Sequence, residues 1–124
     1  MERKFDIEER LIRFAVSMIK VAEILPKSMA GNHLGNQLTR SGSAPALHYG
    51  EAQSAESRTD FIHKMKIALK ELRETHNCLR IINRLEWLET SFLNNSIKEC
   101  NELLAIFVKS IATAQKNKEL NKLK

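Results

Sequence analysis

The stretch LTRSGSAPALHYGEAQSAES, residues 38–57, is unlike the rest of this chain. Small residues dominate it, whereas the segments on both sides are rich in Leu, Ile, Phe, Lys and Glu. Three interpretations fit this composition: a loop, a cradle for a ligand, or a helix that is thin so that a neighbouring helix can approach closely. The patterns on either side of the stretch are needed to choose between them.

Length and composition favour one small helical domain. A chain of 124 residues suits a single core, and its four Gly, two Pro and few β-branched runs point to helices. The net charge of +5 and the pI near 9.4 indicate a mild attraction to polyanions, although solubility alone accounts for such a charge equally well. A basic balance is therefore only weak support for a nucleic-acid partner.

Cysteine use and hydropathy suggest a cytoplasmic protein. Cys78 and Cys100 fall at helical positions rather than in a CxxC pair, which predicts free buried thiols in a reducing compartment. The N-terminal segment MERKFDIEERLIRF has no apolar stretch long enough for a signal peptide. No run approaches the length of a membrane span, so no membrane partner is expected.

Apolar residues recur every three or four positions along four segments, which predicts a single all-α domain over residues 1–124. Three residue pairs resemble capping boxes at helix starts, namely Asp6 with Glu9, Ser57 with Asp60, and Ser96 with Glu99. The segment ETSFLNN is expected to form the last turn. The expected helices span about residues 6–25, 33–55, 58–87 and 96–116, with a polar, frayed tail at 117–124.

Each expected helix has one side that faces a common core. Short turns between four such helices predict an antiparallel up-down-up-down four-helix bundle. The second helix contains Pro45, which must kink it or break it locally. The expected core residues are Ile7, Leu11, Phe14, Met18, Ala22 and Leu25; Leu34, Leu38, Ser41, Tyr49 and Ala52; Phe61, Met65, Ala68, Leu72, His76, Leu79 and Glu86; and Ile97, Cys100, Leu104, Phe107, Ile111 and Ala114.

Two of the helices carry more apolar residues than one core needs. At 100° per residue, Ile12, Val16 and Ile19 lie away from the core side of the first helix. A second cluster, on the third helix, consists of Ile67, Cys78, Ile81 and Leu85. Scattered surface hydrophobes are common, but two aligned patches favour self-association. We expect an oligomer interface at Ile12, Val16, Ile19, Ile67, Ile81 and Leu85.

The third helix also carries a stripe of positive charge, within roughly 80° of arc. Such a stripe can follow a phosphate backbone, and the alternatives are a solvated face or a seam that pairs with acids of a neighbouring subunit. No aromatic residues are interleaved, so base stacking is not indicated. The expected contacts to RNA or DNA are Lys66, Lys70, Arg73, Arg80 and Arg84.

The sequence offers few signs of catalysis. There is no Glu-x-x-His pair for a di-iron centre and no zinc-ligand spacing, and we expect no metal, cofactor or small-molecule substrate. One enzymatic pattern remains as an alternative. Arg58 and His63, in RTDFIH, match the Arg-x4-His spacing of the helical HEPN ribonucleases, which act without a metal on an RNA 2′-hydroxyl.

The block RSGSAPALHYGEAQSAESRTDFIHKMKIALKELRETHNCL, residues 40–79, resembles the signature of the four-helix bundle proteins encoded in 23S rRNA intervening sequences. The matching pieces are the small-residue run at 41–46, YGEA at 49–52, AESRTDFIHKMKIALKE, and RETHNCL. Pro45 and Gly50 stand where many relatives have other small residues, and Cys78 stands where an aromatic residue is common.

The resemblance implies that the stretch is a helix that packs closely, with Glu51 and Glu71 as partly buried acids whose partners include Arg40 or Arg73. It also implies a cyclic homopentamer, as known for this family. The related accessory proteins of diversity-generating retroelements share that assembly and work with nucleic acid and a reverse transcriptase. No enzymatic activity is established for the intervening-sequence proteins, which implies a non-enzymatic role. A structural adaptor that recruits another protein is a further alternative.

Overall fold

The protein is a bundle of four helices. The computed structural model describes the backbone of residues 3–122 and the side chains of residues 7–122. The helices are α1 (Arg3–Glu23), α2 (Met29–Gln53), α3 (Arg58–Leu85) and α4 (Thr90–Lys122). Within the described backbone there is no strand. The all-α prediction and the four-helix bundle are confirmed.

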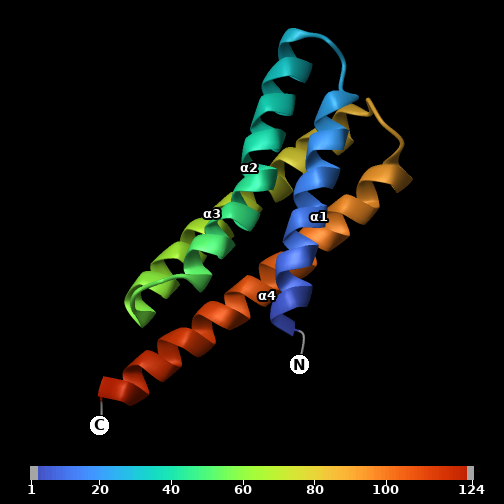
Figure 1. The fold of residues 1–124 in the computed structure, drawn as a ribbon. Helices are drawn as coiled ribbons and strands as arrows, with labels where there is room; N and C mark the ends of the chain where they lie inside the picture. The colour runs from blue at the N-terminus through green and yellow to red at the C-terminus, as the bar shows by residue number, and fades with distance from the viewer. Residues whose placement is uncertain (1–2, 123–124) are drawn as a thin grey trace.

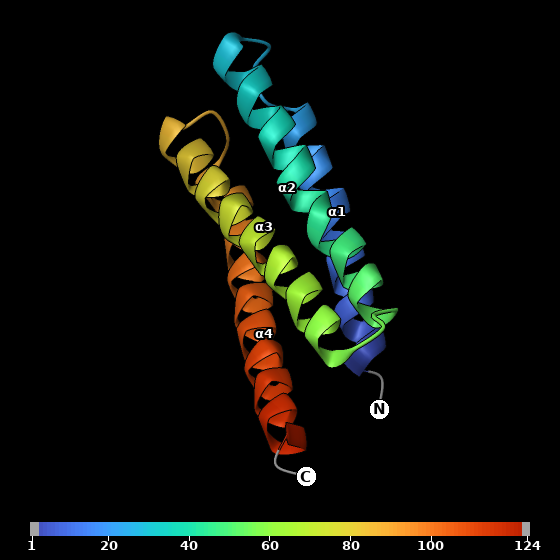
Figure 2. The ribbon, with the colours of Figure 1, turned by 90° about the vertical axis from the view of Figure 1, so that its left-hand side faces the viewer.

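The helices pack as neighbours in chain order. In Figure 1 the chain runs up α1, down α2, up α3 and down α4. Contacts join α1 to α2, α2 to α3 and α3 to α4, while α1 and α4 pack together over a smaller area. Figure 2, turned by 90°, shows α2 and α3 at the front, with α1 behind α2 and α4 behind α3.

The short connections are fixed by local hydrogen bonds. Ser28 is the N-cap of α2, and its Oγ accepts a hydrogen bond from the Gly31 amide at 3.0 Å. Ser57 is the N-cap of α3, and its Oγ accepts from the Asp60 amide at 3.0 Å, which confirms that predicted cap. α3 ends where Glu86 adopts a left-handed conformation with φ of 60°.

Several helix boundaries differ from the expected ones. Because α1 begins at Arg3, Asp6 is not its N-cap, and the Asp6 side chain lies outside the described residues. Because α4 begins at Thr90, Ser96 lies inside a helix, and all of ETSFLNN except Glu89 is helical rather than a turn. The turn is at residues 86–89 instead, so Glu86 is exposed and does not belong to the core. The expected polar tail is the last part of α4 as far as Lys122, and residues 123–124 lie outside the described part.

The apolar faces meet in one core. Leu11, Met18, Leu38, Leu72 and Phe107 are each at most 1% exposed. Most of the expected core residues are buried or pack partly buried against this cluster. The expectation omitted several others that the core buries, namely Val21, Ile62, Ile82, Leu93 and Leu103.

The small-residue stretch is the middle of α2, which runs as one helix through the buried Pro45. A local break at Pro45 is therefore wrong, and a bend of the helix axis stays a prediction. Gly42 faces α1: a Cβ built on it would lie 2.5 Å from Met18 Cβ and 2.6 Å from Met18 Cγ. A side chain at residue 42 would thus force α1 and α2 apart.

Ser41, the residue before Gly42, joins α2 to α3. Its Oγ lies 2.9 Å from Thr75 Oγ1, which also lies 2.8 Å from the Glu71 backbone oxygen. Because a carbonyl oxygen can only accept and a hydroxyl has one proton, Thr75 donates to Glu71 and Ser41 donates to Thr75. Both side chains are buried out of reach of water, so the bond between the two hydroxyls supplies the partner that water would supply at the surface.

Replacing Gly42 with Ala is expected to lower the free energy of unfolding, because overpacking a core costs about 1–3 kcal/mol. Gly50→Ala is the matched control in the same helix. A Cβ there would meet nothing within 4 Å, and Ala should stabilise the helix by about 0.5–1 kcal/mol. Urea unfolding of both variants measures the difference. If Gly42→Ala were as stable as Gly50→Ala, the close approach of α1 and α2 would not hold.

Replacing Thr75 with Val keeps the side-chain shape but leaves the Ser41 hydroxyl buried without a partner, which is expected to cost about 1–3 kcal/mol. Ser41→Ala should cost less, because Thr75 keeps its bond to the Glu71 oxygen. The double variant should recover part of the lost stability, since no buried hydroxyl is then left without a hydrogen-bond partner. Thermal unfolding of the four proteins completes the cycle, and strictly additive effects would mean that the two hydroxyls do not interact.

Candidate nucleic-acid interface

The basic stripe lies along the outer side of α3. Its five side chains start from positions three, four or seven residues apart, which places them above one another on the helix. The opposite side of α3 is buried, with Met65, Leu72 and Leu79 each at most 2% exposed, and this burial fixes which side faces outward. All five members of the basic stripe are exposed: Lys66, Lys70, Arg73, Arg80 and Arg84.

The acids among the described side chains do not balance the positive charge of the stripe. Among the side chains of residues 7–122, none forms an ion pair with the five cations, and Arg80 makes only a 3.4 Å hydrogen bond to the Asn77 side chain. His76 adds no charge at neutral pH, because burial, and secondly the positive charge of Arg80, hold the pKa of its imidazole below the usual value. The stripe is therefore a line of five available cations.

The acids of α3 are bound elsewhere. Arg40 of α2 reaches two of them: its Nη1 lies 2.9 Å from Glu71 Oε1, and its Nη2 lies 2.6 Å from Glu74 Oε1. The hydrogen bond to Glu74 is the main reason why the pKa of the Arg40 guanidinium is raised. Asp60 lies 3.5 Å from Lys64. Because these acids are occupied on other sides of α3, they do not neutralise the stripe.

The prediction of two partly buried acids is confirmed for one of them and wrong for the other. Glu71 is the partly buried acid that the resemblance implied, with 14% of its side chain exposed and Arg40 as its partner. Glu51 is not, since 56% of its side chain is exposed and its near neighbour is His48 Nδ1 at 3.5 Å. Its place three residues after His48, on the outer surface of α2, accounts for the difference.

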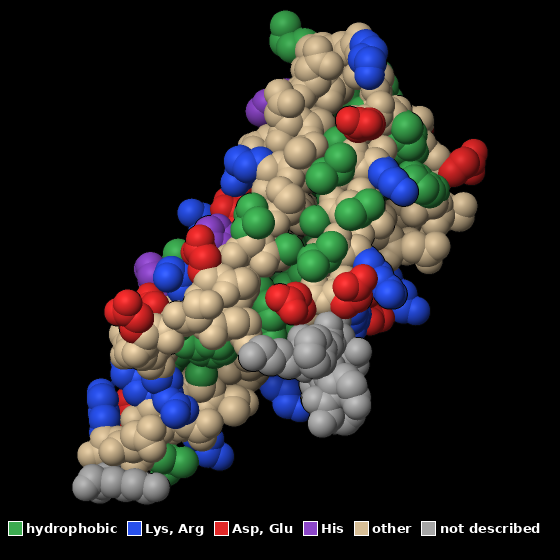
Figure 3. All heavy atoms as spheres, viewed as in Figure 1, with side chains coloured by type: hydrophobic (Ala, Val, Ile, Leu, Met, Phe, Trp, Pro, Cys, Tyr) green, Lys and Arg blue, Asp and Glu red, His purple; other side chains and the backbone are tan. Residues whose placement is uncertain are grey.

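The surplus apolar residues of α1 are on the surface. Ile12, Val16 and Ile19 are 47%, 46% and 37% exposed. Figure 3 shows hydrophobic side chains in a line over α1. Among the described residues no other helix covers them, because α2 and α4 pack on other sides of α1 through Met18 and Arg10.

The second apolar patch, on α3, is smaller than expected. Ile81 and Leu85 are 50% and 44% exposed, and Ile67 is partly buried. Cys78 does not belong to the patch: it is 6% exposed, and its thiol donates to the Leu34 backbone oxygen at 3.7 Å. The thin α2 lets α3 approach closely enough to cover this thiol.

A groove of about 410 Å³ runs between α2 and α3 next to the exposed Ile81. It offers no reactive thiolate, because burial raises the pKa of Cys78 to about 11. The other cysteine, Cys100, is free and buried in the core, and burial raises its pKa to about 12. The residues lining the groove include Leu34, Arg40, Ser41, Glu74, Cys78 and Ile81.

The structure separates the two residues of the ribonuclease alternative. Arg58 lines one groove between α3 and α4, together with Phe61 and Asn117. His63 lines another, together with Lys66 and Lys118. Five residues along a helix amount to about 140° of rotation, so the two side chains leave α3 in different directions. Within one subunit the pair does not share a site.

Neither a metal site nor a membrane span is found in the part of the chain that the structure describes. No group of three or more His, Cys, Asp or Glu side chains within that part is arranged to hold a metal ion. None of the four helices, over their described residues, combines the length and the hydropathy that crossing a membrane requires.

Sequence reasoning missed one of the two arginines that join helices, since it paired only Arg40 with an acid of another helix. Besides Arg40, Arg10 of α1 binds two acids of α4: its Nη2 lies 2.7 Å from Glu99 Oε1 and 2.9 Å from Glu102 Oε1. The hydrogen bond to Glu99 is the main cause that raises the pKa of Arg10. The spacing of Glu99 and Glu102 by three residues is a signal for a shared partner, but it does not tell which helix supplies it.

Comparisons with known proteins agree with this fold. One crystal structure is of a protein of unknown function from the S23 ribosomal protein family of Bacteroides thetaiotaomicron VPI-5482. It is 28% identical, with a TM-score of 0.79, over 85% of this chain and 97% of that one. No curated protein sequence matches the chain. The family model of the 23S rRNA-intervening sequence protein matches residues 3–109, and the chain therefore belongs to that family.

Proposed function

We propose that this protein is a cytoplasmic, non-enzymatic homo-oligomer, a pentamer, that binds the phosphate backbone of RNA or DNA through the basic stripe of α3. The observation that carries the proposal is the set of five exposed cations that no acid of residues 7–122 neutralises.

The dimensions of the stripe suit a phosphate backbone. Eighteen residues separate Lys66 from Arg84, a rise of roughly 27 Å along the helix. At about 3.4 Å per nucleotide, this length matches about eight phosphates of one strand of duplex DNA. Contacts of this kind are made to phosphates and not to bases, so we expect binding with little dependence on nucleotide sequence.

The two apolar patches, which lie on different helices, support self-association. A patch on α1 of one subunit that packs on the α3 patch of the next forms a head-to-tail contact, and such contacts generate rings when the rotation closes. The α1 patch of Ile12, Val16 and Ile19 is exposed in the part of the subunit that the structure describes, which supports this arrangement. A ring would also repeat the basic stripe once per subunit and so strengthen binding through multivalency.

The ribonuclease alternative receives no support from the geometry, because Arg58 and His63 line different grooves. An adaptor role remains the main rival, since exposed apolar patches also fit another protein. Nucleic-acid binding by the purified protein separates the adaptor from the proposed function.

Changing Lys66, Lys70 and Arg73 together to Glu is expected to abolish salt-sensitive binding to nucleic acid while leaving the oligomer intact. The matched control changes Lys98, Lys109 and Lys116 to Glu. These exposed lysines form a similar line on α4, and their substitution reverses the same number of charges. Fluorescence anisotropy with labelled RNA and DNA at several salt concentrations measures both. Equal binding by the α3 variant and the wild type would refute the role of the stripe.

Replacing Ile12 and Val16 with Arg is expected to dissociate the oligomer, because it places charge in the apolar contact. Val108→Arg on α4, where Val108 is 47% exposed, is the control and should leave the mass unchanged. Light scattering on the wild type should give about five times 14.2 kDa. A wild-type monomer would overturn the ring, and an oligomer that survives the double change would place the interface elsewhere.

A further inference from the structure

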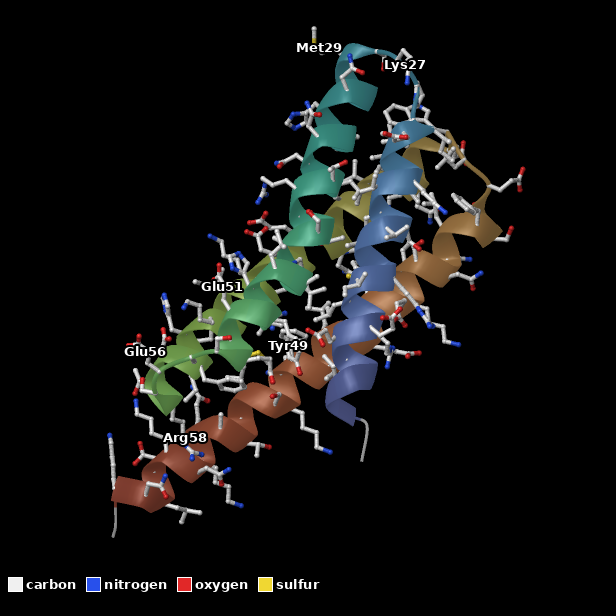
Figure 4. All side chains as sticks on the ribbon, viewed as in Figure 1. Lys27, Met29, Tyr49, Glu51, Glu56 and Arg58 are labelled. Atoms are coloured by element: carbon white, nitrogen blue, oxygen red, sulfur yellow. The ribbon has the colours of Figure 1, made fainter. Side chains whose placement is uncertain are left out.

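A groove of about 410 Å³ lies where the beginning of α3 meets the last part of α4. Six polar side chains line it: Thr59, His63 and Lys66 from α3, and Gln115, Lys118 and Glu119 from α4. In Figure 4 the labelled Arg58 marks this end of the molecule. Lys and Arg side chains gather at the same end in Figure 3.

The groove continues the basic stripe onto a second helix. Lys66 is both the first member of the stripe and a lining residue of the groove. Lys118 faces the same groove from α4, in the segment that the sequence pattern suggested to be a frayed tail. The positive surface therefore does not stop at the beginning of α3, but crosses to α4.

The donors in the groove suit a phosphate. Two ammonium groups, Lys66 and Lys118, supply charge, while the Thr59 hydroxyl and the Gln115 amide supply neutral donors. The acid that lines the groove, Glu119, lies 3.8 Å from Lys122 Nζ, which offsets part of its charge. No Phe, Tyr or Trp side chain lines the groove, and the one ring among its lining residues is the His63 imidazole.

We propose that this groove binds a backbone phosphate of the nucleic acid that lies along α3, with Lys118 as the cation that α4 contributes. The proposal rests on the proposed function, since it extends the same track. It adds a residue outside the stripe and sets the direction in which the strand leaves α3, past Lys66 and towards α4.

The test compares Lys118→Gln with Lys116→Gln. Both remove one positive charge from the same end of α4, but residue 116 points about 160° away from residue 118 on the helix, and the Lys116 side chain does not line the groove. Labelled single-stranded RNA and duplex DNA of equal length are titrated with the full chain at several salt concentrations. Circular dichroism melting verifies that both variants are folded.

Lys118→Gln should weaken binding about fivefold, because one phosphate is no longer neutralised. The slope of log affinity against log salt should fall by about 0.7 for the single-stranded probe or by about 0.9 for the duplex. Lys116→Gln should leave the slope at the wild-type value. If both variants weaken binding equally, a diffuse field and not the groove is responsible, and the proposal fails.

Glu119→Gln is expected to change the affinity for nucleic acid in the opposite direction. It removes the acid that lines the groove, so binding should tighten about fivefold at low salt. Unchanged or weaker binding would overturn the proposal. The outcomes distinguish failure of the proposed function from failure of the groove proposal. A wild type that binds neither probe refutes the proposed function. Salt-sensitive binding that the α3 variant loses and the Lys118 variant keeps refutes only the contribution of α4.

Discussion

The contact between Gly42 and Met18 sets the distance between α1 and α2, and the rest of the bundle is built on that distance. A side chain at residue 42 would meet the Met18 side chain at 2.5 Å. The neighbouring Ser41 hydroxyl bonds to Thr75 on α3. Two consecutive small residues thus fix α2 against both of its neighbours, one by the lack of a side chain and the other by a buried hydrogen bond. Gly lowers the helix propensity of α2, and the close packing that it permits offsets this loss.

The same arrangement determines the electrostatics of α3. With α2 held close, Arg40 reaches Glu71 and Glu74, the two acids of α3 that lie on the side facing α2. The basic side chains are left on the outer side without acidic partners among the described residues. Isolated surface ion pairs contribute little to stability, so the greater effect of Arg40 is to neutralise these two acids away from the basic stripe.

The sequence alone was sufficient for the fold class, most of the core and the cap at Ser57, because these depend on periodicity and on contacts within four residues. It failed where the same local signal occurs inside a helix. Ser96 followed by Glu99 resembles a cap, yet the chain is already helical from Thr90, since burial of Leu93 extends the core face by a turn. The surroundings of Cys78 and Lys118 depend on which helix packs against them. Periodicity along one helix could therefore not show that Cys78 is covered or that Lys118 lines a groove.

The two buried thiols give the molecule an internal reporter of its own motions. Burial raises the pKa of Cys100 to about 12 and that of Cys78 to about 11, so neither reacts readily as a thiolate while the helices remain packed. Cys78 is covered by α2 and Cys100 lies against the Leu72 backbone oxygen of α3. Their rates of alkylation therefore report separately how often α3 parts from α2 and from α4, without any label or substitution.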